Sequence, residues 1–152
     1  MNPFVTGNAI DAGSEAAETE LPELKEFAWD FVHDTFRYDE TGKPKIVTEN
    51  DALEVWIYKC LKTQRWRYQC YRHGIYNDTC EFGVDLEQYI GRNPNNSETA
   101  QEIAKTVKGA LLANPYIKDI PSLRITEIHK ANLTIEAEIQ SIYGDLQISM
   151  TV

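Results

Sequence analysis

The sequence of 152 residues has no long hydrophobic run, since the longest apolar stretches, Val55–Tyr58 and Ala110–Ala113, are four residues each. A membrane span needs about 20 apolar residues and a secretory signal peptide about 7 to 15. Histidine is also scarce, and no His-Glu-x-x-His cluster, glycine-rich phosphate loop or Gly-x-Ser-x-Gly elbow is present. We therefore expect no transmembrane segment, no secretory signal, no metal site, no cofactor and no catalytic residue.

Cysteine and basic residues are the other shortages. Cys60, Cys70 and Cys80 are odd in number and separated by nine residues each time, which fits no metal-binding spacing and predicts free thiols in a reducing compartment. Fifteen Lys and Arg stand against 24 Asp and Glu, so the net charge is -9. A chain of this charge repels nucleic acid and anionic membranes as a whole, and we expect neither as a partner.

The N-terminal residues 1–24 differ in composition from the rest of the chain. They contain five acids, no Lys or Arg, and few large apolar residues, so they are predicted to form an acidic, flexible arm. Over the whole chain, 42% hydrophobic and 26% charged residues are typical of a globular protein. We expect residues 25–152 to form one domain.

The first part of this domain is predicted to form a strand followed by a hairpin. In 25–32 the aromatic residues Phe27, Trp29 and Phe31 alternate with smaller or polar ones, which predicts a strand with these three side chains on its buried face. A turn is predicted at 39–44, where Gly and Pro supply the geometry.

Helical spacing of apolar residues predicts helices in the middle of the chain. One covers roughly residues 50–62, with Thr48 as its N-cap, and a short second helix lies between Phe82 and Ile90. A third begins at Ser97 or Thr99 and ends at Asn114-Pro115. Its predicted apolar face consists of Ala100, Ile103, Ala104, Val107, Leu111 and Leu112.

Beyond Pro121 the pattern changes to strands. Apolar residues alternate with polar ones in 133–140 and again in 146–152, with a turn at 143–145 between them, and the chain ends inside a strand. The order of elements predicts an α+β fold, in which a small mixed, mainly antiparallel sheet packs with about three helices.

The segment 59–72 is the sharpest local anomaly, because it contains five basic residues, three aromatic residues and no acid. This composition is typical of a surface on which nucleic-acid bases stack, and also of hot spots in protein interfaces. The net charge of -9 favours contact with protein carboxylates. Arg65, Trp66 and Arg67 are therefore candidate partner-binding residues.

The last strand is the second candidate binding surface. A strand at the end of a chain is often the edge of a sheet, where its free N–H and C=O groups can pair with another chain. Edges are usually protected by Lys or Pro, and 146–152 contains neither. The alternative is that this strand pairs internally and only closes the sheet. The candidate residues are Leu146, Gln147, Ile148, Ser149, Met150, Thr151 and Val152.

Two short motifs give the chain a family resemblance. The first motif is Leu61-Lys62-Thr63-Gln64-Arg65, after a helix, and the second is Phe82-Gly83-Val84-Asp85-Leu86 through Ile90-Gly91. At both motifs the chain resembles tail proteins of contractile phages and PBSX-like prophages. These belong to the baseplate wedge family that includes the sheath initiators. The order of the predicted elements agrees over about residues 25–152. The family usually has Glu where Gln64 stands, and Pro-Arg-Ile where this chain has Pro115-Tyr116-Ile117.

The resemblance implies a non-enzymatic structural protein at the top of a baseplate in the virion tail, assembled in the cytoplasm of the host bacterium. Its expected partners are the tail sheath protein, baseplate wedge proteins and tail tube proteins, with several copies in a ring. The sheet would accept strands from the first sheath subunits, and the motif adds Thr63 to the candidate partner-binding residues. The alternatives are a regulatory adaptor of the same fold, a lysozyme-like hydrolase, and a nucleic-acid binder. No carboxylate pair stands out for the hydrolase, because pairs such as Glu81 with Asp85 or Glu136 with Glu138 are expected by chance among 24 acids.

Overall fold

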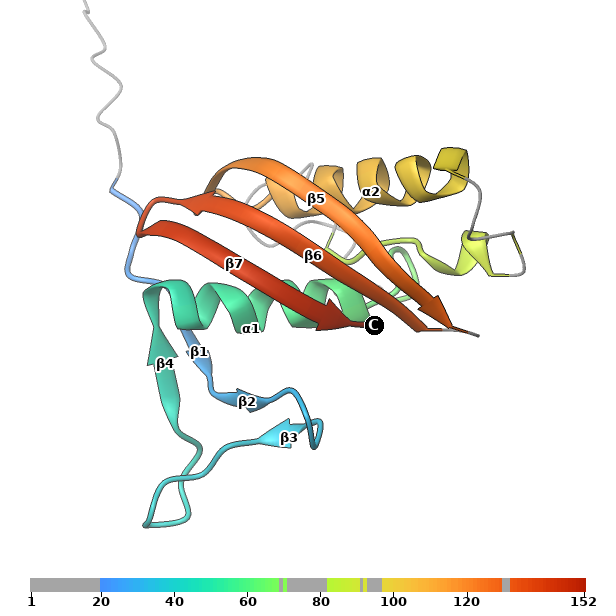
Figure 1. Cartoon of the computed structure of the whole chain (residues 1–152). Helices are drawn as coiled ribbons and strands as arrows, with labels where there is room; N and C mark the ends of the chain where they lie inside the picture. Colours follow the sequence, from blue (N-terminus) through green and yellow to red (C-terminus); the bar gives the residue numbers. More distant parts are fainter. Residues whose placement is uncertain (1–19, 69, 71–81, 91, 93–96, 130–131) are drawn as a thin grey trace, which may run out of the picture.

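The computed structural model describes residues 20–68, 70, 82–90, 92, 97–129 and 132–152. Most of the predicted N-terminal arm, as well as Arg72 and Cys80, lies outside these residues. Within them the expected α+β fold is confirmed: a three-stranded antiparallel sheet carries two helices on one face, and a lobe of four short strands projects beside them (Figure 1). In the described part of the chain, no helix is long and apolar enough to cross a membrane.

The sheet consists of β5 (Ile117–His129), β6 (Asn132–Ser141) and β7 (Gly144–Thr151), in the order β5-β6-β7. The predicted alternation is confirmed in β6 and β7, because apolar side chains such as Ile135 and Ile148 are buried and the residues between them are exposed. Period-2 alternation places every second side chain on the same face. One face of the sheet therefore forms the core and the other faces outward.

Helix α1 (Glu49–Lys62) is confirmed within one residue of its predicted start and supplies the largest share of the core. Leu53 and Ile57 are completely buried, and burial of such a side chain contributes about 1.5 to 3 kcal/mol. The predicted side-chain cap is wrong: the Thr48 hydroxyl makes no capping bond. Instead the backbone N–H of Glu49 donates to the Leu24 carbonyl at 3.1 Å, so the start of α1 is tied to the preceding segment.

Helix α2 (Ser97–Leu112) covers the sheet beside α1, as expected from its spacing. Ile103, Val107 and Leu111 are buried, but Leu112 is 39% exposed and Ala110 takes the inner position. The helix ends before Asn114, whose backbone N–H bonds to the Leu111 carbonyl.

Two expected elements differ from prediction. The segment 82–90 is no α-helix, since only Glu87–Tyr89 forms a single 3-10 turn, Gly83 is a bend, and Val84 forms an isolated bridge with Gln64 at the exit of α1. The described chain thus has two α-helices rather than about three. In addition, β5 begins at Ile117, before Pro121, because register shifts on both sides of Asp119 accommodate the proline in an edge strand.

The projecting lobe is formed by β1 (Lys25–Phe27) with β4 (Ile46–Thr48), and by β2 (Trp29–Asp30) with β3 (Thr35–Phe36). The turn at 39–44 is confirmed, with Gly42 at a φ of +80°.

The predicted burial of the first strand is wrong for Phe27 and holds in part for the other two aromatic residues. Ala28 is buried and Phe27 is 50% exposed, whereas Trp29 and Phe31 are half-buried and pack against the core. The strand breaks at Ala28, and the aromatic rings pack edge-on against one another and against Tyr58 of α1 instead of entering one core.

Candidate functional site

Strand β7 is one of the two outer strands of the sheet. It pairs with β6 in unbroken register from Gly144, opposite Ser141, to Thr151, opposite Thr134. The pairing extends one residue further, because Leu133 and Val152 exchange backbone hydrogen bonds of 2.7 and 2.8 Å. No other strand of the described chain pairs with β7.

The exchanged bonds at Val152 show which backbone groups of β7 point away from the sheet. Hydrogen-bonded and non-hydrogen-bonded pairs alternate along an antiparallel ladder. Met150, Ile148 and Leu146 therefore bond to β6, as Val152 does, while the N–H and C=O groups of the residues between them point outward. Those outward residues are Asp145, Gln147, Ser149 and Thr151, and their side chains are exposed.

The opposite edge, β5, is protected. Its register against β6 is interrupted three times, and Pro121 lacks the N–H that a ladder requires. The Lys108 ammonium group of α2 donates a 2.8 Å hydrogen bond to the Ile120 carbonyl. Bulges, proline and lysine are the usual devices against edge-to-edge pairing. Only β5 carries them, so the two edges of the sheet differ in their readiness to accept another strand.

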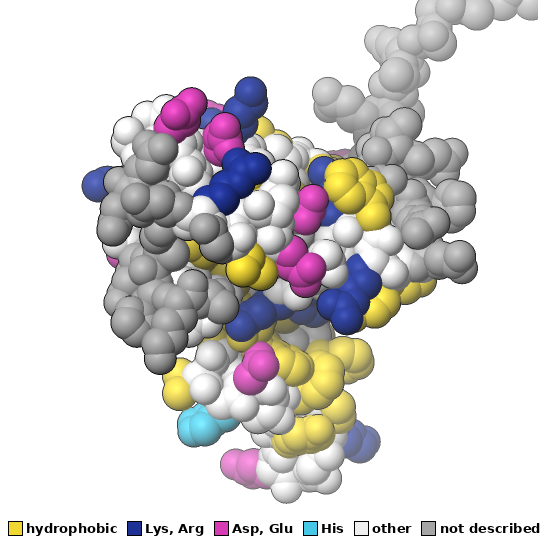
Figure 2. All heavy atoms as spheres, turned by 90° about the vertical axis from the view of Figure 1, so that its right-hand side faces the viewer, with side chains coloured by type: hydrophobic (Ala, Val, Ile, Leu, Met, Phe, Trp, Pro, Cys, Tyr) yellow, Lys and Arg dark blue, Asp and Glu magenta, His cyan; other side chains and the backbone are white. Residues whose placement is uncertain are grey.

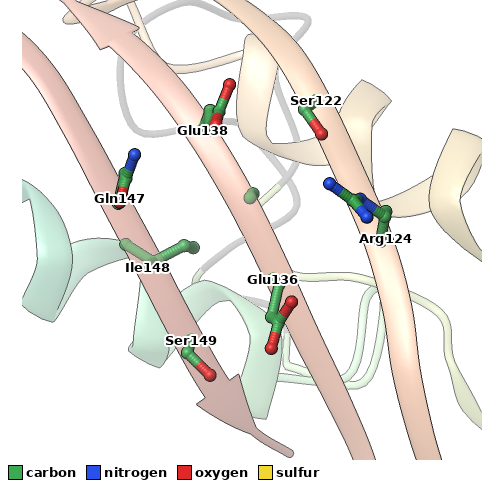
Figure 3. Close-up of a pocket in the computed structure, with 8 residues that line it drawn as sticks. Ser122, Arg124, Glu136, Glu138, Gln147, Ile148 and Ser149 are labelled. Carbon is green, nitrogen blue, oxygen red and sulfur yellow. The ribbon is translucent and has the colours of Figure 1, made fainter.

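The outward face of the sheet beside β7 is a shallow polar surface. It has a hollow of about 280 Å³, into which side chains from all three strands project (Figure 3). The polar lining residues are Ser122, Arg124, Glu136, Glu138, Gln147 and Ser149. Glu136 and Glu138 are exposed on this open face, as their place in the alternation predicted.

The second predicted binding region is the corner at the end of α1. Thr63 ends the helix, and its hydroxyl donates to the Lys59 carbonyl at 2.7 Å. Its own carbonyl accepts the N–H of Val84 at 3.0 Å, and the N–H of Arg65 donates to the Val84 carbonyl at 3.3 Å. Residues 63–65 and 82–84 therefore run side by side, although nearly 20 residues separate them in the sequence.

Gly83 allows this close approach. Its φ is +98°, and a Cβ atom at this position would lie 2.6 Å from the Thr63 carbonyl oxygen. Phe82, next to it, packs edge-on against Trp56 of α1, with 5.5 Å between ring centroids. The two motifs that carried the family resemblance are thus parts of one corner. Thr63 helps to build this corner.

The basic residues of the corner lie close to aromatic and acidic groups of the same chain. Arg65 lies over the ring of Trp66 at 5.6 Å, and Arg67 lies 3.9 Å from a carboxylate oxygen of Glu87. Gln64 joins this group, since its amide nitrogen donates to Glu87 at 2.7 Å. Trp66 is 51% exposed and has a positive φ of 64°. The corner thus presents a half-exposed Trp66 ring with the Arg65 guanidinium over it, while the Arg67 guanidinium lies over the neighbouring Tyr68 ring at 5.8 Å.

The C-terminal end of β7 lies at the same end of the molecule as the corner. Strand β7 packs along α1, and both run toward this end (Figure 1). No group of metal-ligating side chains occurs within the described ranges. Cys60 and Cys70 are free thiols, as predicted.

The sequence comparisons agree with this arrangement. The sequence model of the contractile injection system sheath initiator family matches residues 25–144. The chain belongs to this family. The match ends at residue 144, where β7 begins, so the family model does not cover the edge of β7. That edge is therefore known from the structure alone. No curated protein matches the sequence.

A solved structure supports the fold. A Geobacter sulfurreducens protein described as a candidate tail lysozyme is similar with a TM-score of 0.51 and 20% identity, over 66% of this chain and 86% of that one. At this identity the likeness concerns the fold alone. Family membership makes the protein a structural component of a contractile tail or baseplate, which assembles with sheath and baseplate components.

The sequence did not reveal two parts of these surfaces. The protection of the β5 edge by Pro121 and Lys108 depends on strand order, and a lysine in a helix gives no signal of it. A hollow between the lobe and α1, lined by Trp29, Arg37 and Glu54 among others, was also missed, because its walls come from separate elements.

Proposed function

We propose that the protein initiates the sheath by accepting a strand from each of the first sheath subunits at the β7 edge. Other surfaces hold baseplate wedge and tail tube proteins, and several copies stand in a ring in the virion baseplate after assembly in the host cytoplasm. The observation that carries the proposal is the difference between the edges: β7 is regular and uncovered in the described chain, whereas β5 is bulged and capped by Lys108.

The energy of strand addition fits a role inside an assembly. Four outward residues of β7 offer about eight backbone hydrogen bonds, worth roughly 4 to 12 kcal/mol in total at 0.5 to 1.5 kcal/mol each. Association costs an estimated 4 to 15 kcal/mol or more. An added strand is therefore marginally stable alone and becomes stable when further contacts act with it. A ring of copies supplies such contacts through multivalency.

The inward side chains of β7 fix the register that a partner strand would read. Ile148 and Met150 are buried at 4% and 5% exposure, and Leu146 and Val152 pack against the same core. A slip of one residue would turn these apolar side chains to the outside, so the edge is held in a single register. The rigid register presents the outward N–H and C=O groups at fixed positions.

The corner at the end of α1 provides the second contact of the proposal. Trp66, half-exposed between Arg65 and Arg67, has the composition of an interface hot spot. We assign to it an acidic surface of a neighbouring baseplate protein. If the double variant Arg65→Ala and Arg67→Ala leaves assembly unchanged, this part of the proposal is wrong.

The decisive experiment replaces one outward residue of β7. Ser149→Pro removes an N–H that makes no bond to β6, and proline is tolerated on an edge strand at such a position. Ser149→Val keeps the N–H and serves as the matched control. Each variant is co-expressed with the sheath and wedge proteins encoded beside it, and complexes are followed by size exclusion and negative-stain microscopy.

We expect wild type and Ser149→Val to enter a sheath-containing complex and Ser149→Pro to be excluded from it. Unfolding of the purified variants must first show that Ser149→Pro is folded. These point variants are preferable to truncation after Gly144, which would remove the buried Ile148 and Met150 from the core. Incorporation of a folded Ser149→Pro would refute strand addition at β7. Stoichiometric binding of one soluble protein and no tail protein would favour the adaptor alternative.

A further inference from the structure

The lobe of β1 to β4 exposes large apolar side chains away from the sheet. Phe27 and Ile46 lie directly opposite each other on β1 and β4, and are 50% and 58% exposed. Phe36 packs edge-on against both Phe27 and Trp29, with centroid distances of 6.1 and 4.7 Å. These four residues form the aromatic patch. Figure 2 shows hydrophobic side chains gathered over this lower part of the molecule.

A hollow of about 340 Å³ adjoins the aromatic patch, between the lobe and α1. Trp29 belongs to both, and with Phe31 it forms an aromatic wall of the hollow. Asp51 and Glu54, which are three residues apart on α1, line it from the other side, together with Arg37 of the lobe. The hollow therefore combines aromatic walls with two carboxyl groups and one guanidinium group.

The charge of this hollow is not balanced within the described chain, where neither Asp51 nor Glu54 forms an ion pair. Burial raises the pKa of Glu54, the nearby Asp51 carboxylate raises it further, and only Arg37 acts in the opposite direction. Glu54 is half-buried, so its carboxylate is partly removed from water. A cation placed beside it would stabilise its charged form.

Several observations define what fits the hollow. Aromatic faces attract cations, and a guanidinium group both stacks on such faces and pairs with carboxylates. The N-terminal residues 1–24 contain no Lys or Arg, so no side chain of that segment supplies the cation. The net charge of -9 attracts basic partners over longer distances. The aromatic patch beside the hollow requires apolar cover from the same partner.

We propose that the hollow between the lobe and α1 receives an arginine or lysine side chain of a partner protein, whose neighbouring apolar residues cover the aromatic patch. This contact is separate from the β7 edge, and it predicts that the protein binds two different partner segments. The basic side chain gives the contact its specificity, and the aromatic patch gives it most of its buried apolar surface.

The test uses three short peptides as probes: acetyl-Leu-Arg-Leu-amide, and the same peptide with Gln or Glu in place of Arg. Binding is followed by NMR at the indole N–H signal of Trp29, which the variant Trp29→Phe assigns among the three tryptophans. Peptide concentrations rise to about 10 mM, so that a dissociation constant in the millimolar range is detected.

We expect the arginine peptide to shift the Trp29 signal, the glutamine peptide to bind more weakly, and the glutamate peptide to have no effect. Glu54→Gln should raise the dissociation constant of the arginine peptide by up to roughly fivefold, which is the upper end for the loss of one partly exposed ion pair. The matched control is Glu136→Gln, which makes the same chemical change on the open sheet face and should leave binding unchanged.

Three results would overturn the proposal. The first is the absence of a Trp29 shift with the arginine peptide, and the second is equal binding of the arginine and glutamine peptides. The third is a Trp29 shift that appears without peptide as the protein concentration rises, because a second copy of the chain would then cover the hollow. Since the assay uses free protein and no sheath, its failure is distinct from a failure of strand addition at β7.

Discussion

Gly83→Ala tests the corner at the end of α1 with a single methyl group. That methyl would lie 2.6 Å from the Thr63 carbonyl oxygen and 3.2 Å from the Arg65 nitrogen. An L-residue with a positive φ costs about 1 to 2 kcal/mol, and weakening the two hydrogen bonds to Val84 costs about 0.5 to 1.5 kcal/mol each. We therefore expect the free energy of unfolding to fall by about 2 to 5 kcal/mol.

Two other glycines provide matched controls for the same substitution. Gly42 also has a positive φ, but nothing lies within 4 Å of an added methyl. Gly42→Ala should therefore cost only the backbone strain of about 1 to 2 kcal/mol. Gly109 lies in α2 with open space around it, and Gly109→Ala should stabilise the protein by about 0.5 to 1 kcal/mol.

Urea unfolding, followed by circular dichroism and tryptophan fluorescence, measures the three variants on one scale. The reasoning predicts that Gly83→Ala is the most destabilised, Gly42→Ala is intermediate, and Gly109→Ala is more stable than wild type. If Gly83→Ala loses no more stability than Gly42→Ala, the corner can relax around a methyl group. The close approach of residues 63–65 and 82–84 would then not be the reason for glycine at this position.

Two further predictions concern charged groups. Gln64→Glu replaces the 2.7 Å hydrogen bond to Glu87 with a second carboxylate beside it. The free energy of unfolding should fall by about 0.5 to 1.5 kcal/mol at low salt and by less at 1 M salt. Adding Glu87→Gln should restore the stability, and a double variant that stays destabilised would contradict the assigned contact. Asp30 accepts hydrogen bonds from the His33 ring and from the N–H groups of His33 and Val32, which lower its pKa from 3.8 to about 2. Because the folded pKa lies below the ordinary value, Asp30 stabilises the fold above pH 4, and this contribution is lost as the pH falls toward 2. The stability difference between wild type and Asp30→Asn should shrink over this range, and a carboxyl titration by NMR with a midpoint near 4 would disprove the shift.

Local patterns predicted the elements whose partners lie nearby in the sequence. The alternation of β6 and β7, the apolar stripes of α1 and α2 and the turn at 39–44 are all confirmed. Each of these depends on a period of 2 or 3.6 residues or on turn chemistry, which a single sequence contains.

Contacts between distant segments explain the predictions that were wrong. Phe82, Leu86 and Tyr89 have helical spacing, but backbone bonds between Val84 and the exit of α1 hold the start of this segment beside residues 63–65 instead of in a helix. In the first strand, small Ala28 is buried and Phe27 is exposed, and the strand breaks at Ala28 where the lobe begins. Neither contact leaves a periodic signal in the sequence.

The candidate site was predicted in part for the same reason. The position of 146–152 at the chain end, without Lys or Pro, predicted an edge strand, and β7 is an outer strand of the sheet. That β7 lies at an edge depends on the order β5-β6-β7, which no local pattern encodes. The role of Gly83 in the contact between the two motifs could likewise be seen only from the backbone geometry. In a sequence, a glycine near a helical pattern usually indicates a helix terminus.

Amide hydrogen exchange in β7 tests the central claim most directly. In the free protein, the amides of Ile148 and Met150 should exchange slowly because they bond to β6, while those of Gln147, Ser149 and Thr151 should exchange fast. After exchange in the assembled sheath-containing complex, quenching and dissolution for NMR, the account predicts strong protection of Gln147, Ser149 and Thr151. If these three amides exchange as fast in the assembly as in the free protein, no strand has been added to β7, and the account is contradicted.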